Sequence, residues 1–173
     1  MADGSSTEST EYCIRIETQA GVNIMGEQRI SYVSTLEDVA VTEAYTLQPD
    51  GTRVMVTEDR IRTVDESGGS GELIYSDAKV KVIIFPQVQV GSMLCYKANT
   101  KQHTPYFKNH YFYTRHFSPH GRYENFQLKL THDPKIKLSI DADRVNGGFG
   151  VKWGEWFQNN RFEPLLKLTT EAF

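Results

Sequence analysis

The stretch AYTLQPDGTRVMV, residues 44–56, places the turn-forming residues Pro49-Asp50-Gly51 between two runs in which apolar and polar residues alternate. A period of two puts every second side chain on one face of a strand. A Pro-Asp-Gly turn between two such runs predicts an antiparallel hairpin. A hairpin scaffold does not by itself define a function, so the chemistry of particular residues has to decide.

The same alternation recurs in short runs along most of the chain, separated by turns such as Gly91-Ser92 and Asn146-Gly147-Gly148. No apolar stripe with helical spacing persists for three turns, so we expect little helix. Many short strands separated by turns predict an all-β fold, an antiparallel β-sandwich with little helix. The predicted core consists of Ile14, Ile16, Ile30, Tyr32, Val39, Val41, Tyr45, Val54, Val56, Val80, Val82, Ile84, Leu128, Leu130, Ile136 and Leu138.

The length of 173 residues suits one domain. Residues 1–10 are small and polar, which predicts a disordered leader or an expression remnant. We expect residues 11–173 to form a single β-sandwich domain, with residues 158–173 leading toward a further C-terminal domain. Within this last segment, Pro164–Thr169 is predicted either to close the sandwich as a strand or to lie near an interdomain interface.

The charge balance excludes several classes of partner. The chain has 19 Lys plus Arg against 22 Asp plus Glu, a formal net charge of -3, so it has no electrostatic signature of a nucleic-acid-binding protein. No apolar run is long enough for a membrane span. Because phosphate-binding glycine loops and metalloprotease motifs are also lacking, we expect neither a cofactor nor a bound metal.

Cys95, His132 and Asp143 occur in the order found in transglutaminase-like cysteine enzymes, in which a thiolate needs a base and an orienting carboxylate. A reactive cysteine is usually found at a helix N-terminus or beside a cation. Cys95 instead follows a strand-like run, so a buried structural cysteine is the better interpretation. Two cysteines permit at most one internal disulfide, and the pairing of Cys13 with Cys95 stays open.

A group of histidines raises the possibility of a metal site, because imidazole is the commonest zinc ligand. Six residues of strand would separate His110 from His116 by about 20 Å, too far for one ion. His103 and His120 complete the group, and no carboxylate or thiolate lies beside them in the sequence. Surface histidines are the preferred interpretation.

Aromatic residues are concentrated between Tyr106 and Phe157 and could form a binding face. If residues 109–117 form a strand, alternate aromatic side chains point to one side, and at least one of the two rows faces the core. The residues of the predicted binding face are Tyr111, Tyr113, Arg115, Trp153 and Trp156.

Several short motifs carry a family resemblance over roughly Ala20 to Phe157. They are Tyr45-Thr46 leading into Pro49-Asp50-Gly51, Asp59-Arg60-Ile61-Arg62, Ser76-Asp77, Phe85-Pro86 and Val90-Gly91. With them the chain resembles the domain of unknown function that lies N-terminal to transglutaminase-like domains in bacterial envelope proteins.

The resemblance implies a periplasmic or otherwise extracytoplasmic β-sandwich without catalytic residues, followed by an enzyme domain in the same polypeptide. The leading hypothesis is therefore a noncatalytic accessory domain that positions a transglutaminase-like domain in cis or supplies substrate contacts to it. The alternative is a carbohydrate-binding β-sandwich of the cell envelope that binds glycan or protein. A cysteine hydrolase that uses Cys95 and His132 is a third hypothesis.

Overall fold

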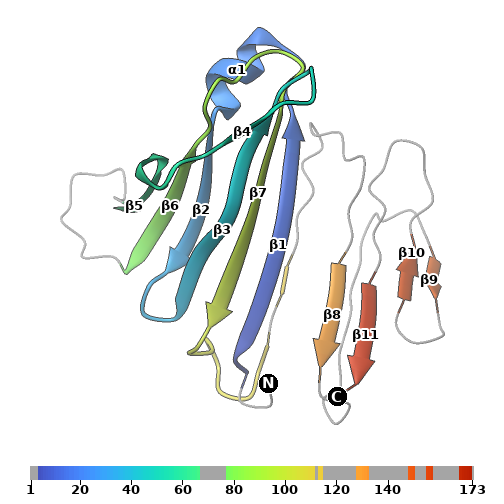
Figure 1. The fold of residues 1–173 in the computed structure, drawn as a ribbon. Helices are drawn as coiled ribbons and strands as arrows, with labels where there is room; N and C mark the ends of the chain where they lie inside the picture. The colour runs from blue at the N-terminus through green and yellow to red at the C-terminus, as the bar shows by residue number, and fades with distance from the viewer. Residues whose placement is uncertain are drawn as a thin grey trace. The chain divides into compact units, whose positions relative to one another are not determined.

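The structure is a computed structural model. It describes residues 4–66, 77–111, 113 and 114, together with four short strands between residues 128 and 172. The chain divides into two compact units (Figure 1). We call Asp3–Tyr111 the N-terminal unit and Phe112–Phe173, together with Met1–Ala2, the C-terminal unit. Each is described by itself, and a single domain over residues 11–173 stays a prediction.

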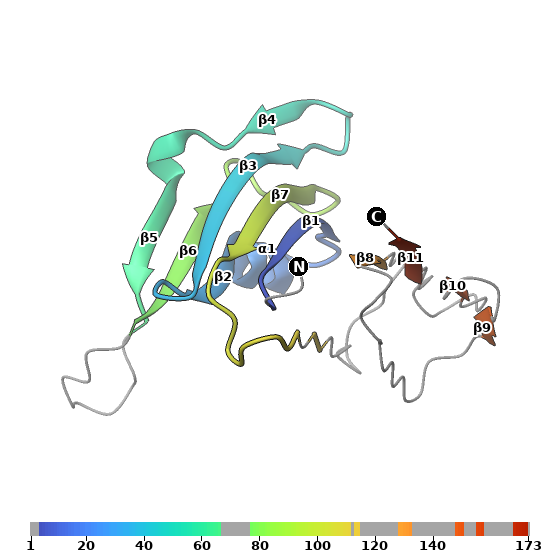
Figure 2. The same ribbon diagram turned by 90° about the horizontal axis from the view of Figure 1, so that it is seen from below.

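Two sheets form the N-terminal unit (Figure 2). The first has the strand order β1-β7-β3-β4 and the second the order β2-β6-β5, and every pairing within them is antiparallel. Their strands are β1 (Ser6–Arg15), β2 (Glu27–Val33), β3 (Glu37–Leu47), β4 (Arg53–Met55), β5 (Ile61–Asp65), β6 (Ala78–Ile84) and β7 (Met93–Gln102). The predicted all-β class, with antiparallel strands and little helix, is confirmed.

The C-terminal unit contributes two pairs of strands. β9 (Gly148–Gly150) pairs with β10 (Glu155–Phe157) in antiparallel orientation, whereas β8 (Leu128–His132) pairs with β11 (Leu168–Ala172) in parallel. Side-chain alternation does not distinguish the two orientations, because both have a period of two. Of the two alternatives for Pro164–Thr169, the structure supports a strand at Leu168 and Thr169, and the preceding residues lie outside the described part.

The predicted hairpin around Pro49-Asp50-Gly51 is present. It joins β3 to β4, and Gln48 N donates to Thr52 O at 2.8 Å. Gly51 has a φ of 89°, a left-handed conformation that glycine adopts without a steric penalty. The backbone N–H of Thr52 donates to Asp50 Oδ1 at 2.8 Å, and this hydrogen bond lowers the pKa of Asp50 from its ordinary value.

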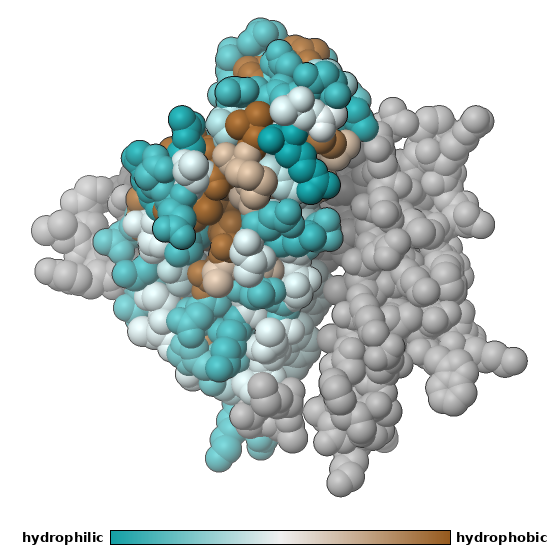
Figure 3. Space-filling model, in the orientation of Figure 1, coloured by the Kyte–Doolittle hydropathy of each residue, from teal (hydrophilic) through white to brown (hydrophobic). Residues whose placement is uncertain are grey.

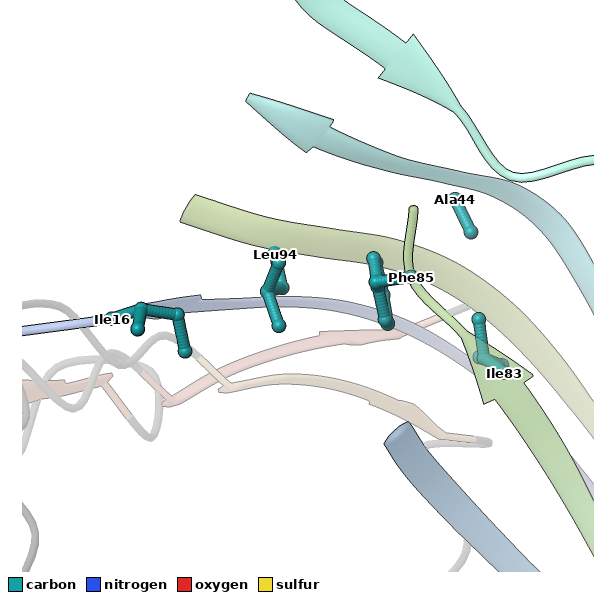
Figure 4. Close-up of a cluster of buried hydrophobic side chains, with 5 residues drawn as sticks. All are labelled: Ile16, Ala44, Ile83, Phe85 and Leu94. Carbon is teal, nitrogen blue, oxygen red and sulfur yellow. The ribbon is translucent and has the colours of Figure 1, made fainter. Parts of the chain in front are cut away.

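The apolar core lies between the two sheets, and Figure 4 shows the five buried side chains of its central cluster. The first sheet provides Ala44 and Leu94, and Ile16 follows β1. Ile83 lies in β6, and Phe85 follows the end of that strand. On the face drawn in Figure 3, hydrophobic residues of the N-terminal unit run as a stripe between hydrophilic surfaces.

The predicted core is confirmed in part. Five of its members are buried, namely Ile16, Val39, Tyr45, Val80 and Val82. Seven more are partly buried, namely Ile14, Ile30, Tyr32, Val41, Val54, Val56 and Ile84. Leu128 and Leu130 lie in β8, where only the backbone is described, and Ile136 and Leu138 lie outside the described residues.

The predicted core omitted one fully buried residue of β6. The sequence places Ile84 in the core, but its neighbour Ile83 is the fully buried residue, with 0% exposure. Val80 and Val82 are buried too, and alternation puts them on the opposite face of β6 from Ile83. β6 is the central strand of its sheet and is covered on both faces there, so a period-two pattern could not identify one inward row.

The expectation of a disordered leader over residues 1–10 was also wrong from Ser6 onward. β1 begins at Ser6 and pairs with β7 along its whole length, from Ser6 opposite Gln102 to Arg15 opposite Met93. The prediction rested on the lack of apolar side chains. Backbone pairing with a neighbouring strand satisfies the N–H and C=O groups without such side chains.

Two further features were not predicted. The helix α1 (Gln19–Met25) follows β1, and the hydroxyl of Thr18 caps it by accepting a hydrogen bond from Gly21 N at 3.1 Å. The 3-10 helix η1 (Glu58–Arg60) precedes β5. Residues 85–92 form a loop between β6 and β7, in which Gln87 adopts a φ of 51° and Gly91 a φ of 89°.

Neighbouring isoleucines in β6 provide a test of this register. Replacing Ile83 with Ala should lower the free energy of unfolding by about 2 to 5 kcal/mol, because the side chain leaves a cavity in the core. The same substitution at the partly exposed Ile84 should cost clearly less. Urea unfolding of both variants measures the difference, and an equal or reversed order would contradict the assigned faces of β6.

Candidate functional site

A disulfide joins Cys13 of β1 to Cys95 of β7. The two residues are directly opposite in the strand register, with their Cα atoms 4.2 Å apart. A cysteine in a disulfide has no thiol, so Cys95 cannot act as a nucleophile while this bond is intact. Of the proposed partners in the cysteine hydrolase hypothesis, His132 ends β8 and Asp143 lies outside the described residues.

Charged groups lie beside the disulfide on the same face of the first sheet. The ammonium of Lys97 contacts Glu43 Oε2 at 3.2 Å and Glu11 Oε1 at 3.8 Å. The hydrogen bond to Glu43, assisted by the charge of Glu11, raises the pKa of Lys97 from its ordinary value. Arg53 stacks over the ring of Tyr45, 4.5 Å from the ring centre.

The histidines do not form a metal site in the part of the chain that the structure describes. His103 and His110 are both exposed, and their Nδ1 atoms contact Thr104 Oγ1 and Lys108 O. His116 and His120 lie outside the described residues. Within the described ranges, no three His, Cys, Asp or Glu side chains are grouped so that they could hold a metal ion.

The residues of the predicted binding face are divided between the two units, and two of them lie outside the described residues. Tyr111 is exposed and ends the N-terminal unit, whereas Tyr113 is partly buried and belongs to the C-terminal unit. Trp156 lies in β10 opposite Phe149. Arg115 and Trp153 lie outside the described residues, so the predicted face remains a prediction.

The strand expected from residue 109 does not begin there. Asn109 has a φ of 61°, a left-handed conformation that ends an extended run, and His110 N donates to Phe107 O at 3.0 Å to close a turn. Tyr106 and Phe107, at 62% and 74% exposure, therefore project from a loop, together with Tyr111. We call Pro105–Tyr111 the aromatic loop.

Neighbouring segments fix both ends of the aromatic loop. Ahead of it, the N–H groups of His103 and Thr104 both donate to Leu36 O, at 3.0 and 3.2 Å. Gly4 packs against it with a φ of 91°, and a Cβ at this position would lie only 2.6 Å from His110 O. Its exposed rings are thus carried on an anchored backbone.

Large exposed aromatic side chains on an anchored loop are a plausible contact surface, since aromatic residues dominate the energetics of protein interfaces. The predicted binding face contains alternate residues of an expected strand and does not include Tyr106 and Phe107. The sequence does carry a local indication of a loop here, because Pro105 and Asn109, which favour turns, flank the two aromatic residues.

Comparison with known families identifies the chain. The family described as "Domain of Unknown Function with solved-structure structure (DUF3857)" matches residues 2–149. The chain belongs to the DUF3857 family. No curated protein matches the chain.

A solved structure resembles this DUF3857 chain in fold. It is the crystal structure of a protein described as a "putative protease" from Parabacteroides distasonis ATCC 8503, with 21% sequence identity and a TM-score of 0.55. The match covers 61% of the present chain but only 21% of the other chain, so the shared fold makes up about a fifth of that longer protein. At this identity the similarity concerns the fold alone.

Among the described helices, none has the length and apolar composition that a membrane-spanning helix requires.

The disulfide is expected to make a measurable contribution to stability. Its cysteines are separated by 82 residues, and a cross-link across a loop of that length restricts the unfolded chain strongly. Replacing both cysteines with Ser should lower the free energy of unfolding by about 2 to 5 kcal/mol in urea titrations without reductant. If the double variant and the parent protein unfold at the same urea concentration, the disulfide does not stabilise the fold.

Proposed function

We propose that this chain is a noncatalytic accessory domain that positions a transglutaminase-like domain of the same polypeptide or supplies substrate contacts to it. The observation that carries the proposal is the match to the Parabacteroides protein, in which the shared fold occupies 21% of a chain described as a "putative protease". A domain that accounts for a fifth of an enzyme polypeptide suits an accessory role. The disulfide of Cys95 supports the same view, since it leaves no thiol there for catalysis.

The proposed location is periplasmic or otherwise extracytoplasmic. The disulfide between Cys13 and Cys95 supports it, because disulfides form and persist in oxidising compartments and are rare in the cytosol. The family resemblance found in the sequence points to the same compartment.

The aromatic loop is the proposed contact surface of the accessory domain. Tyr106 and Phe107 expose rings on an anchored backbone, so they can bury apolar area against a partner without a large cost of ordering. An envelope glycan is the second candidate for this surface, because the loop also presents polar groups at Lys108 and His110.

Paired substitutions in the intact polypeptide test the proposal. Replacing Tyr106 and Phe107 with Ala should lower the kcat/KM of the transglutaminase-like domain about five- to thirtyfold. This is the loss expected when contacts worth about 1 to 2 kcal/mol are removed. Because both side chains are exposed, the stability of the fold should change little. The matched control is Met55→Ala, an exposed apolar side chain on β4, which should leave the kinetics unchanged.

Two results would contradict the accessory role. The first is an intact polypeptide that carries no transglutaminase-like domain. The second is unchanged kinetics in the double variant together with loss of saturable binding to soluble envelope glycan fragments, which would assign the aromatic loop to carbohydrate binding instead.

A further inference from the structure

The two sulfur atoms of the disulfide are in unlike surroundings. Cys13 is exposed and lies on β1, which is the edge strand of its sheet in the part of the chain that the structure describes. Cys95 is only 3% exposed and lies on β7, between β1 and β3. In β3, the buried residue Tyr45 is the register partner of Cys95.

This asymmetry determines where a thiolate can attack. Thiol–disulfide exchange proceeds by attack of a thiolate on one of the two sulfur atoms, and access selects which sulfur is attacked. We propose that Cys13 is a thiol-exchange site, at which a small thiol or a dithiol reductant attacks in the folded protein. This inference does not depend on the proposed accessory role.

Reduction of the disulfide takes two exchange steps. A reductant thiolate attacks Sγ of Cys13, which forms a mixed disulfide there and breaks the bond to Cys95, and Sγ of Cys95 leaves as a thiolate and takes up a proton. A second reductant thiolate then attacks the reductant sulfur of the mixed disulfide and releases Cys13 as a thiolate. The protein disulfide gains two electrons, and the two reductant thiols become one disulfide.

The charged groups on the face of Cys13 are balanced, with two cations against two carboxylates. Arg15 lies two residues along β1 on the same face and is exposed. The negative charges of Glu11 and Glu43 on that face are partly offset by the ammonium of Lys97 between them. A cation near the sulfur stabilises an approaching thiolate.

Reduction would act on β1 before the rest of the unit. Most residues of β1 are exposed, and the strand is held by backbone pairing with β7, by the tilted ring contact of Tyr12 with Tyr96, 5.4 Å apart, and by Ile14 near its end, which packs against the core. Ile16, just after the strand, is buried in the core and marks where this weakly buried segment ends. Breaking the disulfide therefore loosens β1 and leaves the central cluster in place.

Trapping of the mixed disulfide tests the proposal in the full chain. The folded protein is incubated with reduced glutathione, quenched with acid, alkylated and digested, and the position of glutathione is determined by mass spectrometry. At least tenfold more glutathione is expected on Cys13 than on Cys95. Equal labelling, an excess on Cys95, or exchange that requires denaturant would overturn the proposal.

Single-cysteine variants provide the matched control. In Cys95→Ser the remaining Cys13 thiol should react with an aromatic disulfide reagent at least tenfold faster than the Cys95 thiol in Cys13→Ser, and guanidinium should make the two rates equal. Circular dichroism establishes that each variant is folded, and if one is not, the glutathione measurement on the parent protein decides. Equal rates in two folded variants would overturn the proposal.

Discussion

The N-terminal unit depends on the packing of the end of β6 against the first sheet. Ile83 and Phe85 meet Leu94 and Ala44 there, and each of these four residues is almost completely removed from solvent. Burial of aliphatic and aromatic side chains is the main favourable term in folding, worth roughly 1.5 to 3 kcal/mol for each large side chain. Without this contact the two sheets would be linked mainly through their connecting segments.

β7 connects the core to both neighbouring strands of the first sheet. It pairs with β1 on one side and with β3 on the other, each over ten register positions. The disulfide adds a covalent link to β1, a strand in which no residue is fully buried. The loop that follows β7 continues into the exposed rings of Tyr106 and Phe107, so the proposed contact surface extends directly from the most extensively paired strand.

Local sequence patterns predicted the parts of this fold that depend on local chemistry. The Pro49-Asp50-Gly51 turn specifies its own hairpin, because Gly51 adopts the left-handed conformation and Asp50 accepts a hydrogen bond from Thr52. Positions decided by tertiary contacts were not predictable in this way. Ile83 is buried in addition to Val80 and Val82 because both faces of β6 are covered there. Ser6 is ordered by a strand more than ninety residues away in the chain.

In the candidate site, too, local features were predictable from the sequence and tertiary contacts were not. Aromatic residues near position 110 were evident in the sequence, but the alternation that predicts a strand there does not reveal the turn at Asn109 or the exposed loop positions of Tyr106 and Phe107. The sequence left the pairing of Cys13 and Cys95 open, because the spacing of two cysteines does not reveal strand register. Register places them opposite each other and thereby removes the nucleophile from the cysteine hydrolase hypothesis.

Nuclear Overhauser contacts across β7 test the central role of this strand most directly. In an antiparallel pair, the Hα atoms of closely spaced partners face each other, and alternate residues of a central strand face alternate neighbours. The register predicts Hα–Hα contacts between Cys13 and Cys95 on one side and between Ala44 and Tyr96 on the other. Absence of both contacts, or a shift of either by one residue, would contradict the arrangement of β1, β7 and β3 on which this account rests.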